Sequence, residues 1–158
     1  MPKKIRAVFD TSSIIFLDHL NYLTALRSLH EVVITPVVAW ELTQHKSGAG
    51  SKVPDWIEQI NPKASFLAKV KKEANLDVGE SSVIALALDT ELLIVLDDNS
   101  ARRFAVKQGL RITGTLGVLL ELHRRELATR SLNDDLQLLS DFGMFISDEL
   151  KSLILASL

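Results

Sequence analysis

Five consecutive apolar residues at 92–96 constrain the fold of this chain more than any other segment. A strand with one solvated face alternates apolar and polar side chains, whereas a continuous apolar run is typical of a strand buried on both faces of a parallel sheet. The run ends at Asp97, Asp98, Asn99 and Ser100, which are residues that favour the start of a helix. The segment therefore predicts a central parallel strand followed by a helix.

Strand-like and helix-like segments alternate along the rest of the chain. Short β-prone runs at 5–9, 32–35 and 110–113 are each followed by a segment with helical spacing of apolar residues. This alternation predicts an α/β fold, namely a three-layer α/β/α sandwich with a mostly parallel sheet of about four to five strands. A small, polar stretch with two glycines at 45–52 predicts a surface loop.

Composition excludes several kinds of chemistry. The 158 residues contain no cysteine, so disulfide scaffolds, cysteine-ligated metals and thiol nucleophiles are excluded. No apolar run reaches the ~20 residues of a membrane span, and the N-terminus lacks an apolar stretch of signal-peptide length. We therefore expect a cytoplasmic protein with no membrane partner.

Acidic residues stand where two of the predicted strands end. Asp10 follows the first strand, and Asp97 and Asp98 follow the apolar run. Two further acids lie on helices: Glu41 on the helix after the second strand, and Glu80 at the start of the helix before the apolar run. Because ligands of open α/β sheets bind at the carboxyl ends of the strands, these acids are candidate site residues.

Each acid also has a structural explanation. Asp10 could cap the helix that follows it, and so could the acids after the apolar run. Asp77 and Glu80 have the spacing of a capping box, and Glu41 could lie on a solvated helix face. Carboxylates gathered at one sheet edge, however, would repel one another unless cations lay between them. Oxygen ligands suit Mg²⁺ or Mn²⁺, ions that activate water and stabilise the leaving oxygen of a phosphodiester.

Four segments resemble, in order, the motifs of the PIN-domain family, the metal-dependent ribonuclease fold of the VapC-type toxins. Each contains an acid next to a strand end or on the first turns of a helix: VFDTSSII, ITPVVAWEL, GESSVIALAL and LLIVLDDNSARRFA. The later segment GTLGVLLELHRREL, with the two amphipathic segments after it, resembles a branch of predicted PIN-domain nucleic-acid-binding proteins.

The resemblance implies a Mg²⁺- or Mn²⁺-dependent ribonuclease that cleaves single-stranded RNA by metal-activated water, and the toxin of a type II toxin–antitoxin pair. It implies four catalytic acids: Asp10, Glu41, Glu80 and Asp98. The same acids and Asp97 are the candidate metal ligands, and alignment favours Asp98 over its neighbour. The family's third acid aligns with Ser81, so Glu80 stands one residue early.

The offset of Glu80 leaves a second function open, a catalytically weak or inactive PIN-fold module that binds RNA or protein. The hydroxyls of Thr11 and Ser12 are candidates for positioning water or phosphate, with helix capping as the alternative. Arg102 and Arg103 follow Asp98 closely and are either contacts to an RNA backbone or ordinary solvated residues.

We expect residues 1–130 to form a PIN-like nuclease domain and residues 131–158 a C-terminal helical extension of the same domain. The extension ends in an apolar stripe at helical spacing: Leu150, Leu153, Ile154 and Leu158. This stripe could pack back on the domain, pair two copies into a homodimer, or bind an antitoxin protein. The expected partners are therefore an RNA substrate, an antitoxin and a second copy of the chain.

Overall fold

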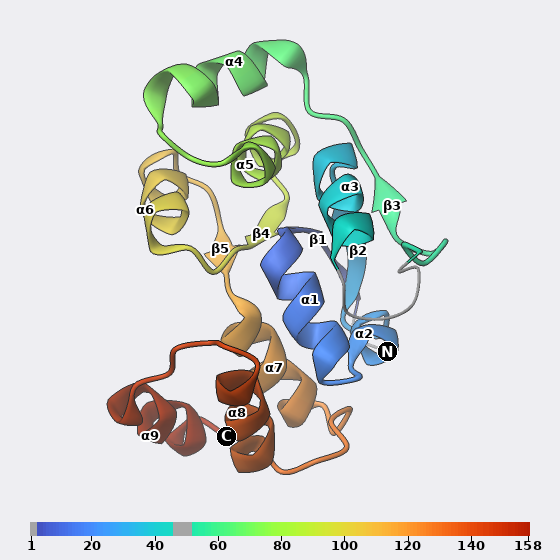
Figure 1. Ribbon diagram of the computed structural model, residues 1–158, viewed down its shortest axis with the longest axis vertical. Coiled ribbons are helices and arrows are strands. Elements are labelled where there is room, and N and C mark those ends of the chain that lie inside the picture. Colours follow the sequence, from blue (N-terminus) through green and yellow to red (C-terminus); the bar gives the residue numbers. More distant parts are fainter. Residues whose placement is uncertain (1–2, 46–51) are drawn as a thin grey trace.

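Five parallel strands form one sheet in the computed structural model, which describes residues 3–45 and 52–158 (Figure 1). The strand order is β3-β2-β1-β4-β5. The strands are β1 (Ile5–Phe9), β2 (His30–Ile34), β3 (Glu58–Gln59), β4 (Leu93–Val95) and β5 (Ile112–Thr113). The predicted α/β class with a parallel sheet is confirmed, and most of the loop predicted at 45–52 lies outside the described residues.

Nine helices occur in the described parts of the chain. They are α1 (Thr11–His19), α2 (Leu23–Leu26), α3 (Pro36–Gln44), α4 (Ala64–Glu73), α5 (Val78–Thr90), α6 (Asn99–Lys107), α7 (Thr115–Arg124), α8 (Leu132–Asp141) and α9 (Asp148–Ala156). Within these parts, no helix is long and apolar enough to cross a membrane.

Helices cover both faces of the sheet. The consecutive residues Ala7, Val8 and Phe9 of β1 are all 0% exposed. Because successive side chains on a strand point to opposite faces, burial of all three requires a layer of structure on each side. Ile94 and Val95 of β4 are buried in the same way. The predicted three-layer α/β/α sandwich is thus confirmed.

The order of the strands reverses between the neighbouring strands β1 and β4. These two strands pair in parallel, with Phe9 opposite Val95, and the N–H of Asp10 donates a 3.0 Å hydrogen bond to the carbonyl of Val95. From β1 the chain continues to β2 on one side, and from β4 to β5 on the other. Such a switch point opens a crevice at the carboxyl ends of the two strands.

The last three helices lie together at one end of the molecule, away from α4 (Figure 1). Helix α8 begins at the N-cap Ser131 and α9 at the N-cap Ser147, and each serine side chain accepts a hydrogen bond from the first turn of its helix. Gly143, which follows α8, has a φ of +105° and lets the chain turn towards α9.

Candidate functional site

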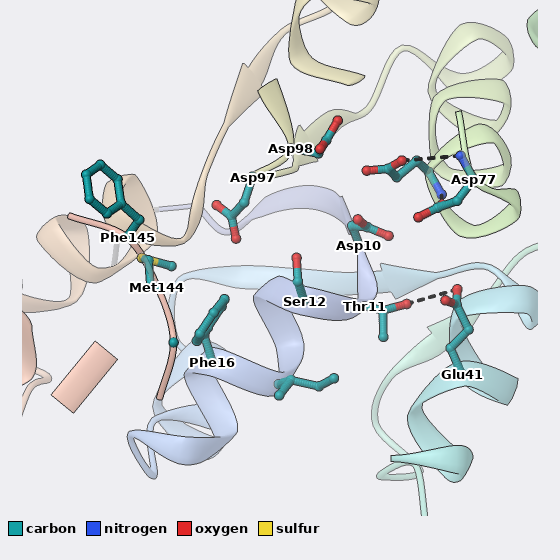
Figure 2. Close-up of a pocket in the computed structure, with 13 residues that line it drawn as sticks. Asp10, Thr11, Ser12, Phe16, Glu41, Asp77, Asp97, Asp98, Met144 and Phe145 are labelled. Atoms are coloured by element: carbon teal, nitrogen blue, oxygen red, sulfur yellow. Dashed lines mark hydrogen bonds between the residues drawn. The ribbon is translucent and has the colours of Figure 1, made fainter. Parts of the chain in front are cut away.

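A pocket of about 570 Å³ opens at the carboxyl ends of β1 and β4 (Figure 2). Six carboxylates line it: Asp10, Glu41, Asp77, Glu80, Asp97 and Asp98. Thr11 and Ser12 line it as well. The structure therefore brings together all five acids that the sequence offered as metal ligands, with both candidate hydroxyl residues beside them.

Asp10 lies at the centre of this group. It occupies the N-cap position of α1, yet its side chain makes no capping hydrogen bond and is 7% exposed. The capping explanation for this acid is therefore wrong. In Figure 2, Asp10 and Ser12 lie between Asp97 on one side and Asp77 and Glu41 on the other.

The pKa of Asp10 reflects this crowding. Burial raises it from 3.8 to about 7, and the backbone N–H of Thr11 opposes the increase in part. The nearby carboxylates of Glu80, Asp77 and Glu41 raise it further. A carboxyl group with such a pKa favours a proton or a cation as its neighbour, because either one offsets a negative charge that burial and the nearby carboxylates disfavour.

Glu41 reaches the pocket from α3 on the far side of Thr11. The Thr11 hydroxyl donates a 3.1 Å hydrogen bond to Oε1 of Glu41 (Figure 2). Burial raises the pKa of Glu41, the bond from Thr11 opposes that shift, and Asp77 adds to it. A Cβ placed on Gly79 would lie 2.2 Å from the same Oε1, so the carboxylate occupies space that only a glycine leaves free.

Glu80 and Asp77 form the predicted capping box of α5. The N–H of Glu80 donates to Oδ1 of Asp77 at 2.7 Å, and the N–H of Asp77 donates to Oε1 of Glu80 at 3.3 Å. Burial raises the pKa of Glu80 to about 7, with repulsion from Asp77 and Asp98 acting in the same direction. The capping role and the place in the pocket therefore coexist in one side chain.

Asp97 and Asp98 both line the pocket but are held differently. Asp98 caps α6, accepting a 2.9 Å hydrogen bond from the N–H of Ala101. Asp97 accepts two hydrogen bonds from the buried Thr115, 2.8 Å from its N–H and 2.6 Å from its hydroxyl. Asp97 is thus held by the first turn of α7. Asp97 and Asp98 both line the pocket, although they are neighbours in the sequence.

The structure adds residues that sequence reasoning missed. The sequence predicts Asp77 only as a helix cap, although its spacing from Glu80 also puts it near the acidic site. Met144 and Phe145, from the segment between α8 and α9, form the side of the pocket next to Asp97 (Figure 2). No local pattern pointed to these two, because they come from a part of the chain remote from the acidic motifs.

The two candidate arginines differ in their surroundings. Nη1 of Arg102 donates a 2.7 Å hydrogen bond to the carbonyl of Leu96, at the end of β4. Arg103 is exposed, and its Nη2 donates to the hydroxyl of Ser100 at 3.1 Å. Both lie in a groove of about 460 Å³ along α6, and neither lines the acidic pocket.

The donor atoms of the pocket are of the kind that binds a divalent cation, but they are not arranged as a complete ligand set. Its donors are carboxylate oxygens, the ligands that Mg²⁺ and Mn²⁺ prefer, and the pKa of Asp10 and of Glu80 is raised to about 7. Across residues 3–45 and 52–158, however, no three acids or histidines lie close enough to form a finished ligand set. Carboxylates in this pocket would have to move inward to hold an ion together.

Comparisons with known proteins agree with this architecture. The family model described as "DUF3368: PIN domain" matches residues 6–158. One similar solved structure is the crystal structure of VapBC2 from Rickettsia felis bound to a DNA fragment from their promoter. The TM-score is 0.52 at 14% identity, and the match covers 70% of this chain and 98% of that chain. This likeness shows the fold, and no curated protein matches the chain.

Proposed function

Since the chain belongs to the PIN-domain family, we propose that it is a ribonuclease that uses Mg²⁺ or Mn²⁺ to cleave single-stranded RNA. The observation that carries the proposal is the carboxylate of Asp10. It is buried, does not cap its helix, and shares the crevice at the ends of β1 and β4 with other carboxylates. A buried acid with a strongly raised pKa in such a crevice is typical of a functional site.

The proposed metal ligands are Asp10, Glu41, Glu80, Asp97 and Asp98, and all of these except Asp97 form the proposed catalytic set. When bound, Mg²⁺ or Mn²⁺ supplies the Lewis acidity that activates water and stabilises a leaving oxygen. Thr11 orients Glu41 through the 3.1 Å hydrogen bond, and Thr115 holds Asp97 through the 2.6 Å bond. We propose that the hydroxyl of Ser12, which lines the pocket, positions a water or a phosphate oxygen.

Contacts to the RNA backbone are proposed along α6. The groove there starts at Asn99, directly after Asp98, and contains Arg103 and Lys107, which are both exposed. Cations in this position would hold phosphates on the strand that leaves the acidic pocket. Arg102 contributes charge from the side of the groove while its guanidinium remains bonded to the end of β4.

A role as the toxin of a type II toxin–antitoxin pair in the cytoplasm is proposed from the family and from the fold shared with a VapBC2 complex. The apolar stripe, which runs along α9 and ends just beyond it at Leu158, supports a protein partner, either an antitoxin or a second copy of the chain. Leu153 and Leu158 of this stripe are exposed, whereas Ile154 packs against the core. We propose that the exposed part of the stripe is covered in such an assembly.

A second candidate function is an RNA-binding module without catalytic activity. Two observations favour it: no finished ligand set exists among the described residues, and Glu80 is engaged in the capping box of α5. Both functions use the same pocket, and only the first requires the carboxylates to gather around an ion.

Cleavage of single-stranded RNA in Mn²⁺ separates these functions. We expect the wild type to cut the RNA, Asp10→Asn to lose activity by about 100-fold or more, and EDTA to abolish it. Asp18→Asn is the matched control, because Asp18 is an exposed acid on the same helix outside the pocket. Equal activity of wild type and Asp10→Asn would overturn the catalytic proposal, and binding without cutting would favour the second function.

A further inference from the structure

Phe145 is the most exposed of the large apolar side chains that the structure describes, at 89%. It lies on the edge of the acidic pocket, beyond Asp97 and next to Met144 (Figure 2). A single exposed aromatic ring on a surface needs no explanation, but a ring beside a concave polar site is a candidate contact for a ligand.

The outward position of Phe145 is fixed by its neighbours. Met144 and Ile146 pack against the hydrophobic core, and the N–H of Met144 donates a 2.9 Å hydrogen bond to the carbonyl of Leu139 in α8. With both flanking side chains held against the core, the side chain of Phe145 faces solvent. The left-handed turn at Gly143 places this segment beside the pocket.

The pocket consequently has two chemically distinct sides. Most of the carboxylates lie on one side, and Phe16, Met144 and Phe145 lie on the other, beyond Asp97 (Figure 2). In Figure 2, Asp97 is the acid nearest to the apolar side. A ligand that fits both sides has two features. It carries negative charge that a cation could bridge to the acids, and it has a flat apolar surface next to that charge.

We propose that Phe145 is a stacking platform for a nucleobase of single-stranded RNA adjacent to the phosphate bound at the acids. The proposal rests on the function proposed above and deepens it by assigning the residue that positions the strand. Stacking on an aromatic ring accepts any base, and an unpaired base is free to stack while a base inside a duplex is not. A preference for single-stranded RNA without strict sequence specificity at this position follows.

A binding measurement tests this assignment apart from cleavage. A labelled single-stranded oligoribonucleotide is titrated in Ca²⁺, with the integrity of the RNA verified on a gel. Phe145→Ala should bind about tenfold more weakly than the wild type, and Phe145→Tyr should bind within about twofold of it, since the ring is retained. Leu155→Ala is the matched control, because Leu155 is 39% exposed, does not line the pocket and is not one of the four residues of the apolar stripe.

Oligonucleotides with one abasic position each locate the stacked base. For the wild type, one abasic position should weaken binding by about tenfold, and in Phe145→Ala the same position should have no further effect. This loss of additivity is specific for contact between the ring and that base. Thermal melting should show Phe145→Ala as stable as the wild type, since an exposed ring contributes little to the core.

Equal affinity of wild type and Phe145→Ala for RNA would overturn the assignment. It would also be overturned if every abasic position weakened the binding of Phe145→Ala as much as it weakens the binding of the wild type. Absence of RNA binding by the wild type would overturn it too. Unchanged RNA affinity combined with altered self-association of Phe145→Ala would identify a protein interface instead. If RNA binding depends on Phe145 but the wild type never cuts RNA in Mn²⁺, the nuclease function fails and the stacking assignment stands.

Discussion

The hydroxyl of Tyr22 donates a hydrogen bond of 2.7 Å to Oδ2 of Asp135, which lies 113 residues later in the chain. Nε2 of His123 lies 2.7 Å from the same oxygen, and Nε of Arg130 donates to Oδ1 at 2.7 Å. Asp135 is 0% exposed. This buried carboxylate links α8 to the start of α2 and to the end of α7, and so holds the C-terminal helices on the sheet domain.

Replacing Asp135 by alanine should destabilise the protein by about 3–5 kcal/mol, because the guanidinium of Arg130 and the hydroxyl of Tyr22 would lose a buried partner. Urea unfolding followed by circular dichroism measures the effect. Asp134→Ala serves as the control, since this neighbouring acid is exposed in the first turn of α8 and should cost less than about 1 kcal/mol. Equal losses in the two variants would contradict a structural role for the buried network.

The role of Asp135 illustrates what the sequence could not predict. Helical spacing puts Asp135 on the apolar side of α8 with Leu132 and Leu136, unlike the exposed Asp134, but the sequence does not show which groups would bond to a buried carboxylate there. Its partners come from distant segments, so the network exists only after the chain has folded. Strand β3 was missed for a related reason: two polar residues on a sheet edge carry no hydrophobic pattern.

The strand ends were predictable because the signal is local. Apolar runs at 7–9 and 92–96 define the ends of β1 and β4, and the first polar residue after each run is an acid. Parallel pairing of these strands then brings Asp10 and Asp97 to one edge of the sheet without further information. The contact between Glu41 and Gly79 and the approach of Phe145 depend on how helices and loops pack, so the sequence did not predict them.

Stability of the metal-free protein should fall as the pH rises from about 4 to about 7, the two values between which the pKa of Asp10 is shifted. Burial raises the pKa of Asp10 from 3.8 to about 7, so at intermediate pH the folded state binds a proton that the unfolded state has released. The contribution of the group is complete below its unfolded pKa and is lost as the pH rises through about 7.

Asp10→Asn tests this origin by urea unfolding in EDTA. The amide has no proton to lose, so the variant should exceed the wild type in stability at pH 8 by about 2 kcal/mol and differ less at pH 5. Asp18→Asn should retain the wild-type pH profile, because Asp18 is exposed. A parallel profile for wild type and Asp10→Asn would show that the raised pKa of Asp10 does not govern the slope.

Mn²⁺ should raise the melting temperature at pH 8 and have little effect at pH 5. The ion must compete with protons on carboxyl groups, and the pKa values of Asp10 and Glu80 are both raised to about 7. A ligand that binds only the folded state stabilises it in proportion to the logarithm of its concentration, so at pH 8 the melting temperature should rise with added Mn²⁺. Asp10→Asn should flatten this dependence. An equal shift at both pH values would place the ion elsewhere on the protein.

Gly79→Ala should lower RNA cleavage by changing the geometry of the site while leaving the stability of the fold nearly unchanged. The new Cβ would lie 2.2 Å from Oε1 of Glu41, and the tip of a flexible side chain moves away at little cost while alanine favours the helix. Glu41 would then lose its bond from Thr11, and RNA cleavage in Mn²⁺ should fall by about 10- to 100-fold with stability within about 1 kcal/mol of wild type. Gly117→Ala is a close control, because its Cβ would meet Oγ1 of Thr113 at the same 2.2 Å outside the pocket. Full activity in Gly79→Ala would show that the position of Glu41 is not required.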